Sequence, residues 1–488
     1  MQLAPILRRD STWLAAQLLF GLLGGVVIGI ALGASIVGSV WILIGISFIV
    51  LGALFLSNVE TALVFFIFVN YIRLPHIIEV FHNGPPVTEL FLLAFWGTIA
   101  FRMVINSAYP RGWVVPLVIL TIHFCTTTVG LLYARDTGLV RREILFFAAD
   151  AVIVLAIVVG IQDFQTFKQA IWGFIIGSLL LGLLGIYQFL TSTYTNDYWG
   201  FAVSDVSTIV DNVQDVRLGG PAGNGNFFAQ MMVIVIPLSF ERALHEESRL
   251  MRFLAAFALI IGIVTVILTF SRSGFIALAV VIVTFLILYP PRLTQLVVML
   301  IAFLLLLPFV PDSYIGRILT LGGIRQGIEG EAEIDNSSIR RYSYLVAGLE
   351  MFEDYPFLGI GAGNFPAAYV DYVRDTGIVS NRVQTTRSPH NLYLEFLSER
   401  GIIGFAAFGL VLSTVIYSII SSRQYFLQVN ALQQSHMITA LGISVLGFLI
   451  FGLFLHLSNP RYFWILAGIC WSATSIANNC SLSEDSQV

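Results

Sequence analysis

Charged residues are scarce in this chain. Only 11% of its 488 residues are Asp, Glu, Lys or Arg, and the net charge is −4. So little charge cannot cover the surface of soluble domains, and no run of Lys and Arg offers a surface for nucleic acid. Lysine is almost missing, because the chain has 24 arginines but Lys168 as its single lysine. Arginine keeps its charge and grips phosphate or carboxylate with paired hydrogen bonds, although a GC-rich genome would produce the same bias.

Cysteines and metal-binding motifs are also scarce. The three cysteines, Cys125, Cys470 and Cys480, have no paired spacing and indicate neither a disulfide framework nor a zinc site. No aspartate pair of the kind used by metal-dependent sugar transferases stands out, so an enzyme built on this chain is predicted to work without a metal or another cofactor. The sequence also lacks the internal repeat that marks many transporters.

Long apolar runs make up most of the chain. Hydrophobic residues account for 57% of it, and the mean hydropathy is +0.87. Runs of about 20 apolar residues can cross a hydrocarbon core as helices. They predict an all-α polytopic membrane protein with about 12–14 transmembrane helices, in a single integral membrane domain over residues 1–488. The predicted spans are 12–34, 36–56, 58–72, 87–106, 113–133, 143–161, 168–190, 224–241, 250–270, 274–289, 292–309, 401–421, 435–456 and 461–478.

The arginines in short loops indicate an orientation. A cytoplasmic N-terminus places most of them on the inside, among them Arg8, Arg9, Arg242, Arg249 and Arg252. Arg135, Arg141 and Arg142 fall on the outer side in this frame and favour the opposite one. We adopt the first orientation as the prediction.

Two long segments then lie on the outer side. They are an outer loop at 191–223 and a large extracytoplasmic loop at 310–391, whose roughly 80 residues are too many for a simple connection and must fold over the bundle. Apolar spacing predicts short helices at 343–352, 367–374 and 391–400. The glycine-rich run at 359–363 is interpreted as a turn between two of them, because no strand precedes it as in a phosphate-binding loop.

A polar cluster lies where the large loop returns to the membrane. His390 follows Pro389 and is accompanied by Asn391, Tyr393 and Glu395. A neutral imidazole can accept the proton of a sugar hydroxyl, as a glycosyl-transfer base must. The alternative is a histidine that merely caps a helix at the interface. The three polar neighbours of His390 favour the role of a base. The other histidines are interpreted as structural: His76, His82, His123, His245, His436 and His456.

Several arginines are candidates for binding an anion. Arg272 lies in a tight Ser-Arg-Ser-Gly turn between two apolar spans, where it either snorkels to lipid head groups or meets an anion inside the bundle. Arg217 precedes a glycine-rich stretch that ends in Asn224 and Asn226, which is either a flexible hinge or an anion-binding helix start. Further outer cations, which a solvated face would explain equally, are Arg340, Arg341 and Arg387.

These motifs together resemble the O-antigen ligase and O-antigen polymerase superfamily. The resemblance covers about residues 215–405 and is carried by the stretches 223–226, 271–274, 356–361, 389–395 and 401–404. It implies a bacterial inner-membrane enzyme with a glycosyltransferase-C-like architecture. Such an enzyme moves a glycan from undecaprenyl diphosphate onto an acceptor hydroxyl, carried by a glycan or glycolipid, at the outer face. Neither metal nor nucleic acid takes part, and the anomeric carbon is inverted.

The resemblance also implies residue roles. His390 would be the base on the acceptor hydroxyl, while Arg217 and Arg272 would hold the donor diphosphate. Arg341 would assist from the loop, although the adjacent Arg340 could equally match the family motif. The substrate-binding set is completed by Arg387, Asn391, Tyr393, Glu395, Asn224 and Asn226.

Four functions stay open at the level of sequence: a polymerase, a ligase, a flippase, and a wall-enzyme or receptor-like membrane scaffold, which would have no arginines pointing into the bundle. A polymerase adds glycan to another lipid-linked glycan, whereas a ligase adds it to lipid A core or another acceptor. A span count nearer fourteen than twelve favours the polymerase. A flippase for lipid-linked sugars would also be apolar with inward-facing arginines, but it would need no large outer loop ending in a histidine and would show two similar halves.

Overall fold

The computed structural model describes residues 59–84, 88, 92, 96–97, 110–208, 214–289, 336–376, 388–456 and 460–485. The first of these elements are α3 (Val59–Tyr71), α4 (Leu74–His76), the π-helix η1 (Ile77–Phe81), α6 (Val114–Val129), the 3-10 helix η2 (Gly130–Leu132), α7 (Thr137–Gly160) and α8 (Phe164–Leu190). Next come η3 (Tyr198–Gly200), β1 (Ser204–Thr208), β2 (Gln214–Leu218), η5 (Gly220–Ala222), α9 (Gly225–His245), α10 (Arg249–Leu268) and α11 (Arg272–Leu288). The last are α14 (Asn336–Asp354), α15 (Phe365–Thr376), α16 (Leu392–Gln428), α17 (Leu432–Gly452) and α18 (Arg461–Asp485).

Most of the described apolar runs are helices of membrane-spanning length. Seven are long and apolar enough to cross a bilayer: Val114–Leu132, Thr137–Gly160, Phe164–Leu190, Gly225–His245, Arg249–Leu268, Leu392–Gln428 and Leu432–Gly452. This confirms the prediction of an all-α polytopic membrane protein. The predicted spans 12–34, 36–56 and 292–309, and nearly all of 87–106, lie outside the described residues, so the total of 12–14 stays a prediction. The predicted span 58–72 is a bent pair, since α3 and the helix that follows it meet at 56°.

Short polar side chains mark where several helices begin. Asp136 accepts hydrogen bonds from the backbone of Gly138 and Leu139 at the start of α7. Asp163 does the same for Thr166 in α8, at 3.0 Å. These caps satisfy backbone donors that have no partner within the helix, which matters most where water is scarce. Asp136 and Asp163 therefore fix where α7 and α8 begin.

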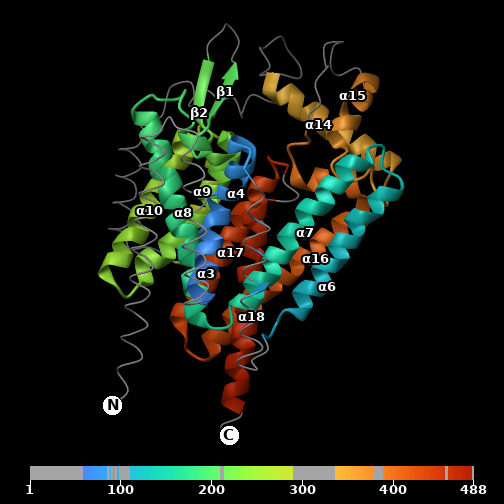
Figure 1. The fold of residues 1–488 in the computed structure, drawn as a ribbon. Helices are drawn as coiled ribbons and strands as arrows, with labels where there is room; N and C mark the ends of the chain where they lie inside the picture. The colour runs from blue at the N-terminus through green and yellow to red at the C-terminus, as the bar shows by residue number, and fades with distance from the viewer. Residues whose placement is uncertain are drawn as a thin grey trace, which may run out of the picture.

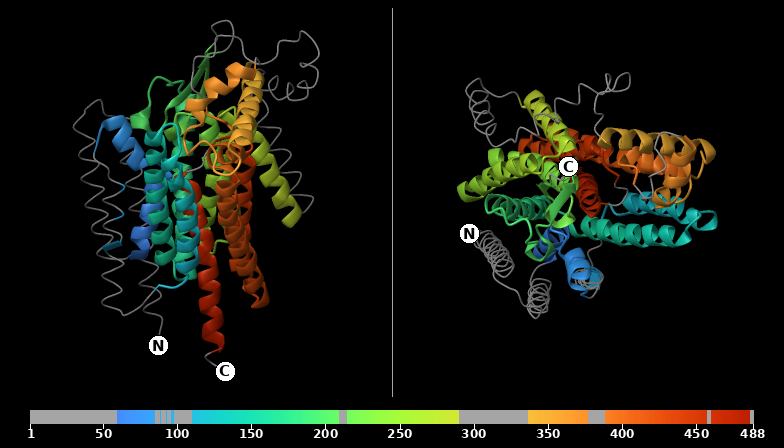
Figure 2. Two further views of the ribbon diagram at one scale, coloured as in Figure 1. Left: turned by 90° about the vertical axis from the view of Figure 1, so that its right-hand side faces the viewer. Right: turned by 90° about the horizontal axis from the view of Figure 1, so that it is seen from above.

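The helices form two groups with two helices between them. α8, α9 and α10 pack together on one side, and α6, α7 and α16 pack together on the other (Figure 1). α17 contacts α9 and α16, and α18 contacts α7 and α16 on one side and α8 on the other, so these two helices join the groups (Figure 2). The buried apolar side chains of all these helices form one continuous core.

One end of the bundle carries the elements outside the spans. The β1–β2 hairpin and the helices α14 and α15 lie at the same end, opposite the C-terminal end of α18 (Figure 1). We call this the capped end. The hairpin was not predicted, because its strands are short, polar and without a clear alternation of apolar residues.

The described part of the large loop folds on its own small core. Tyr344, Met351, Phe365 and Tyr369 from α14 and α15 are buried against one another. The predicted helices 343–352 and 367–374 are confirmed within α14 and α15. α14 also lies directly on α16, because a Cβ atom at Gly348 would come within 2.7 Å of the Leu394 side chain.

The long helix α16 is broken at Gly401. This residue has φ 60° and ψ −167°, which separates the predicted helix 391–400 from the span that follows. The turn before α15 hydrogen-bonds to the break: Ile360 N donates to Ser398 O at 3.0 Å, and Ile402 N donates to Pro356 O at 2.8 Å. The Glu399 carboxylate accepts from Gly363 N at 2.7 Å, close to the start of α15. The turn interpretation of 359–363 is thereby confirmed, and this turn fastens the loop helices to the span.

Replacing Gly359 with alanine is expected to loosen this attachment. Gly359 has φ +68°, and an added Cβ would lie 2.3 Å from the backbone carbon of Glu399. Neither the backbone strain nor the clash can be relieved by rotating a side chain, so we expect a loss of about 2–4 kcal/mol of stability. Thermal unfolding in detergent, followed by size-exclusion chromatography, measures the effect. Gly409→Ala is the matched control, because nothing lies within 4 Å of a Cβ there; equal melting temperatures for the two variants would contradict the prediction.

Candidate functional site

His390 lies at the capped end, directly before α16. Its backbone has φ 49°, in the left-handed region that few non-glycine residues adopt, and its side chain is half-buried. The Tyr344 ring of α14 stacks on the imidazole with ring centres 5.5 Å apart. The ring of His456 meets it nearly at right angles, 4.9 Å away. Aromatic rings from the loop helices and from the chain after α17 therefore fix how His390 is presented.

His456 is a second histidine in the same cluster. It follows the end of α17 and lies between His390 and Phe227, whose ring centre is 5.9 Å away. Burial and, to a smaller extent, the nearby charge of His390 lower the pKa of His456 to about 3. Its Nδ1 atom is buried and makes no hydrogen bond within the described part of the chain. His456 therefore stays neutral at physiological pH. Its contact with His390 shows that it is not a lone histidine, while its interpretation as structural stays a prediction.

Asn391 and Tyr393 hold the start of α16 against α17. The Asn391 side chain accepts hydrogen bonds from the backbone of Tyr393 and Leu394, at 2.9 and 3.0 Å, and donates to Leu453 O at 3.2 Å. The Tyr393 hydroxyl donates to Leu449 O at 2.8 Å. Glu395, one turn into the helix, is 8% exposed. Asn391 and Tyr393 thus position His390, and a contact of these three residues with substrate stays a prediction.

The start of α9 is joined to the start of α11. Asn224 caps α9 by accepting from Asn226 N at 3.0 Å. The Asn226 side-chain oxygen in turn accepts from the Ser271 hydroxyl at 2.7 Å, and Ser271 caps α11 by accepting from Gly274 N at 3.1 Å. Arg272, the first residue of α11, is half-buried. Two helix N-termini, each the positive end of a helix dipole that favours anions, are therefore held side by side with an arginine at one of them.

Arg217 is joined to this region through the hairpin. It lies opposite Asp205 in the antiparallel register of β1 and β2, and their charged groups form an ion pair at 3.1 Å. The other role of Asp205 is to accept a hydrogen bond from Gly225 N, at 3.0 Å, in the first turn of α9. Asp205, which the sequence did not single out, therefore fixes Arg217 beside the start of α9 and offsets part of its charge.

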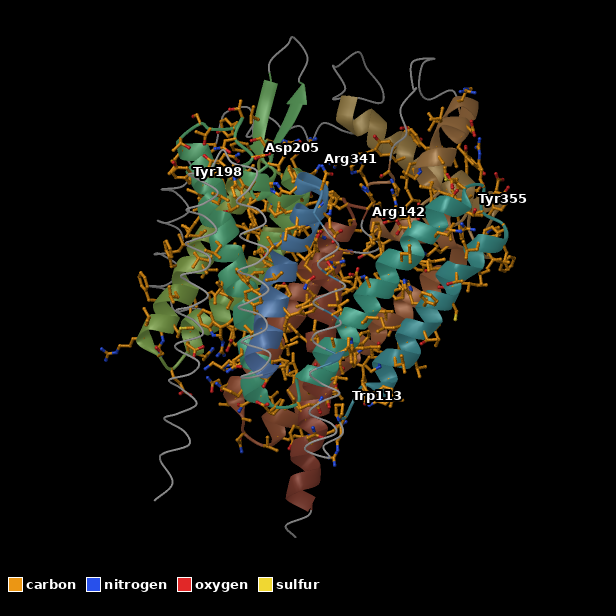
Figure 3. All side chains as sticks on the ribbon, in the orientation of Figure 1. Trp113, Arg142, Tyr198, Asp205, Arg341 and Tyr355 are labelled. Carbon is orange, nitrogen blue, oxygen red and sulfur yellow. The ribbon has the colours of Figure 1, made fainter. Side chains whose placement is uncertain are left out.

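The predicted cations of the large loop are only partly described. Arg341 is exposed and stands one helical turn before Tyr344 in α14, at the capped end, where Figure 3 also labels Asp205. Arg340 belongs to the same helix, but its side chain lies outside the described residues, as does all of Arg387. The question of which of Arg340 and Arg341 acts stays open.

Contacts connect the predicted base to the predicted diphosphate arginines. Phe227, in the first turn of α9, contacts His456, which contacts His390. The preceding residue, Asn226, accepts from Ser271 beside Arg272. Segments far apart in the sequence are thereby brought to one place at the capped end. His456 and Asp205 carry no local sequence signal for this, because their role depends on which segments meet in the fold.

The described residues offer no obvious metal centre. No three His, Cys, Asp or Glu side chains among them are grouped closely enough to hold a metal ion. The expectation that the chain works without a metal stays a prediction.

Part of the chain matches a known protein family. Residues 257–409 match the family model described as O-antigen ligase, whereas a search of curated proteins finds no match. The matched stretch covers slightly less than a third of the chain and includes Arg272, Arg341 and His390, whereas Arg217 and His456 lie outside it. The match agrees with the resemblance seen in the sequence and shows that residues 257–409 are similar to the O-antigen ligase family.

Proposed function

We propose that this protein is a polysaccharide repeat-unit polymerase of the bacterial cytoplasmic membrane. It takes the glycan from an undecaprenyl-diphosphate-linked donor and transfers it onto a hydroxyl of an acceptor glycan at the outer face. The observation that carries the proposal is the series of contacts from His390 through His456 to the start of α9, where Asn226 is hydrogen-bonded to Ser271 beside Arg272. A possible base and fixed positive charge thus meet at one end of a membrane bundle.

His390 performs the proton transfer in this proposal. Its imidazole accepts the proton of the acceptor hydroxyl as the oxygen attacks the anomeric carbon of the donor sugar. The bond from that carbon to the diphosphate oxygen breaks, and the electron pair leaves with undecaprenyl diphosphate. Attack opposite the leaving group inverts the anomeric carbon. His456 is neutral beside His390 and so leaves it free to gain the proton, since a second positive charge 4.9 Å away would oppose protonation.

The arginines stabilise the leaving group. Negative charge grows on the diphosphate as the glycosidic bond breaks, and fixed guanidinium groups aimed at that charge lower the barrier. Arg272 at the start of α11 and Arg217 beside the start of α9 have this role, helped by the positive ends of both helix dipoles. Asp205 orients Arg217 for the contact. Arg341 assists from α14, the helix whose Tyr344 ring stacks on His390.

Reconstitution with one defined substrate tests the proposal. The purified protein is placed in liposomes with an undecaprenyl-diphosphate oligosaccharide, and three readouts are followed: growth of the glycan chain, labelling of an added lipid A core acceptor, and movement of substrate between leaflets. Chain growth on the lipid-linked glycan is expected. Labelling of the added acceptor without chain growth would replace the polymerase by a ligase. Movement between leaflets without transfer would replace both by a flippase.

Replacing His456 is expected to slow the transfer, because its neutral ring supports His390. His456→Phe keeps an aromatic ring between Phe227 and His390 and should retain at least about a tenth of the transfer rate, whereas His456→Ala leaves His390 unsupported and should lose about a hundredfold. Initial rates at saturating donor measure the difference. Equal rates for the alanine variant and the wild type would show that His456 does not position the base. His436→Ala, a half-buried histidine at the start of α17, is the control.

A further inference from the structure

Arg73 lies at the break between α3 and α4. Its backbone has φ 60° and ψ 26°, a left-handed conformation that a side chain disfavours, yet the residue is an arginine rather than a glycine. Such strain is retained where the surroundings or the function require the residue. α4 is drawn at the same end of the bundle as β1 and β2 in Figure 1. The break therefore presents a cation at the capped end.

The contacts of Arg73 lead to the glycine-rich turn before α9. Its Nη1 atom donates to Pro221 O at 3.5 Å, a long hydrogen bond to a neutral group. Arg461 is within electrostatic reach, but Arg461 is paired with Asp150 at 3.0 Å and also donates to Asn70. Within the described part of the chain, no carboxylate is paired with Arg73 itself. Its charge is thus less compensated than that of Arg461.

Three arginines from three separate elements border the segment from Pro221 to Asn226. Arg73 reaches it through Pro221 O, and Arg217 is joined to it through Asp205 and Gly225 N. Arg272 follows Ser271, which donates to Asn226. Of the three, Arg217 is already paired with a carboxylate. A ligand that carries two phosphate groups would therefore find additional positive charge at Arg73.

We propose that Arg73 binds the diphosphate of a polyprenyl-linked ligand, together with Arg272, across the turn that precedes α9. The inference rests on the proposed function for the identity of this ligand as the glycan donor. The chemistry that is recognised is a phosphate group at the membrane surface, which a lipid head group also offers. Arg73 is a binding residue in this assignment, and the proton transfer is left to His390.

A binding measurement without turnover tests the proposal. The full-length protein in nanodiscs of zwitterionic lipid is titrated with undecaprenyl diphosphate, and the dissociation constant is compared between the wild type and three variants. Arg73→Gly removes the charge and suits the left-handed backbone, so lost binding cannot be attributed to strain at this residue. Arg73→Lys keeps the charge, and Arg249→Ala removes an exposed arginine at the start of α10 as the control.

Arg73→Gly is expected to weaken binding at least about tenfold, while Arg73→Lys loses less and Arg249→Ala binds like the wild type. Equal dissociation constants for Arg73→Gly and the wild type would overturn the assignment. If anionic lipid in the nanodisc weakens diphosphate binding to the wild type but not to Arg73→Gly, head groups share the Arg73 position. If the wild type binds undecaprenyl diphosphate through Arg73 yet transfers no glycan in liposomes, the proposed function fails and the Arg73 assignment stands.

Discussion

His390→Ala is expected to lose about a thousandfold or more in transfer rate while the protein remains folded in the membrane. A positioned general base contributes about 10²–10⁴-fold to a rate, and the half-buried His390 is held in place by the rings of Tyr344 and His456. A water molecule is not held in the orientation in which His390 accepts the proton, so it cannot replace the base. The variant should therefore lose turnover number rather than donor affinity. Polysaccharide length in cells and initial rates in liposomes measure the effect.

The His390→Ala result needs a control that separates chemistry from folding. His436→Ala changes a half-buried histidine near the start of α17 and should leave the transfer rate within about threefold of the wild type. Both variants should elute from size-exclusion chromatography as the wild type does. Polysaccharide of wild-type length made by His390→Ala would remove this residue from the site.

Arg272→Ala is expected to lose about a hundredfold to a thousandfold in transfer rate. Removing one donor that stabilises growing negative charge costs other enzymes about this much, and Arg272 lies where two helix N-termini meet. Arg272→Lys should recover part of the loss, because the charge remains but the two-pronged contact to phosphate is gone. Rates at saturating donor, and the donor concentration at half-maximal rate, report the change.

Arg111→Ala is the matched control for Arg272→Ala. Arg111 is an exposed arginine just before α6, close to Trp113, which Figure 3 labels near the end of the bundle opposite the capped end. Its loss should leave the rate unchanged. If Arg272→Ala and Arg111→Ala were equally active, fixed charge at the start of α11 would have no part in the reaction, and Arg272 would be a residue that meets lipid head groups.

The sequence predicted those parts of the fold that depend on the length of the apolar runs and on the polar residues between them. The runs around α7, α8, α9 and α10 were found in the sequence, because a bilayer requires long apolar helices and capping residues such as Asp163 mark their starts. The break at Arg73 and the β1–β2 hairpin were not found. A broken span and a polar hairpin depend on neighbours that the local pattern does not reveal.

The candidate site was predictable where chemistry and local structure coincide. Three predicted residues lie at or beside the start of a helix that follows a polar turn: His390, Arg272 and Asn224. For these residues, the motif and the place at a helix start both indicated a role in the site. His456 and Asp205 became recognisable only through their partners, a histidine 66 positions away in the sequence and an arginine on the opposite strand. No local pattern contains that information.

The contact between His390 and His456 has a consequence for the synthesis and membrane insertion of the protein itself. His456 comes after α17, whereas its partner His390 precedes α16, so two complete membrane passages are synthesised between them. A nascent chain that has inserted everything up to α16 already holds Arg272 and His390 but lacks the ring that supports the base. In the proposed mechanism, the support of the base is therefore complete only after α17 has been inserted and His456 has been synthesised.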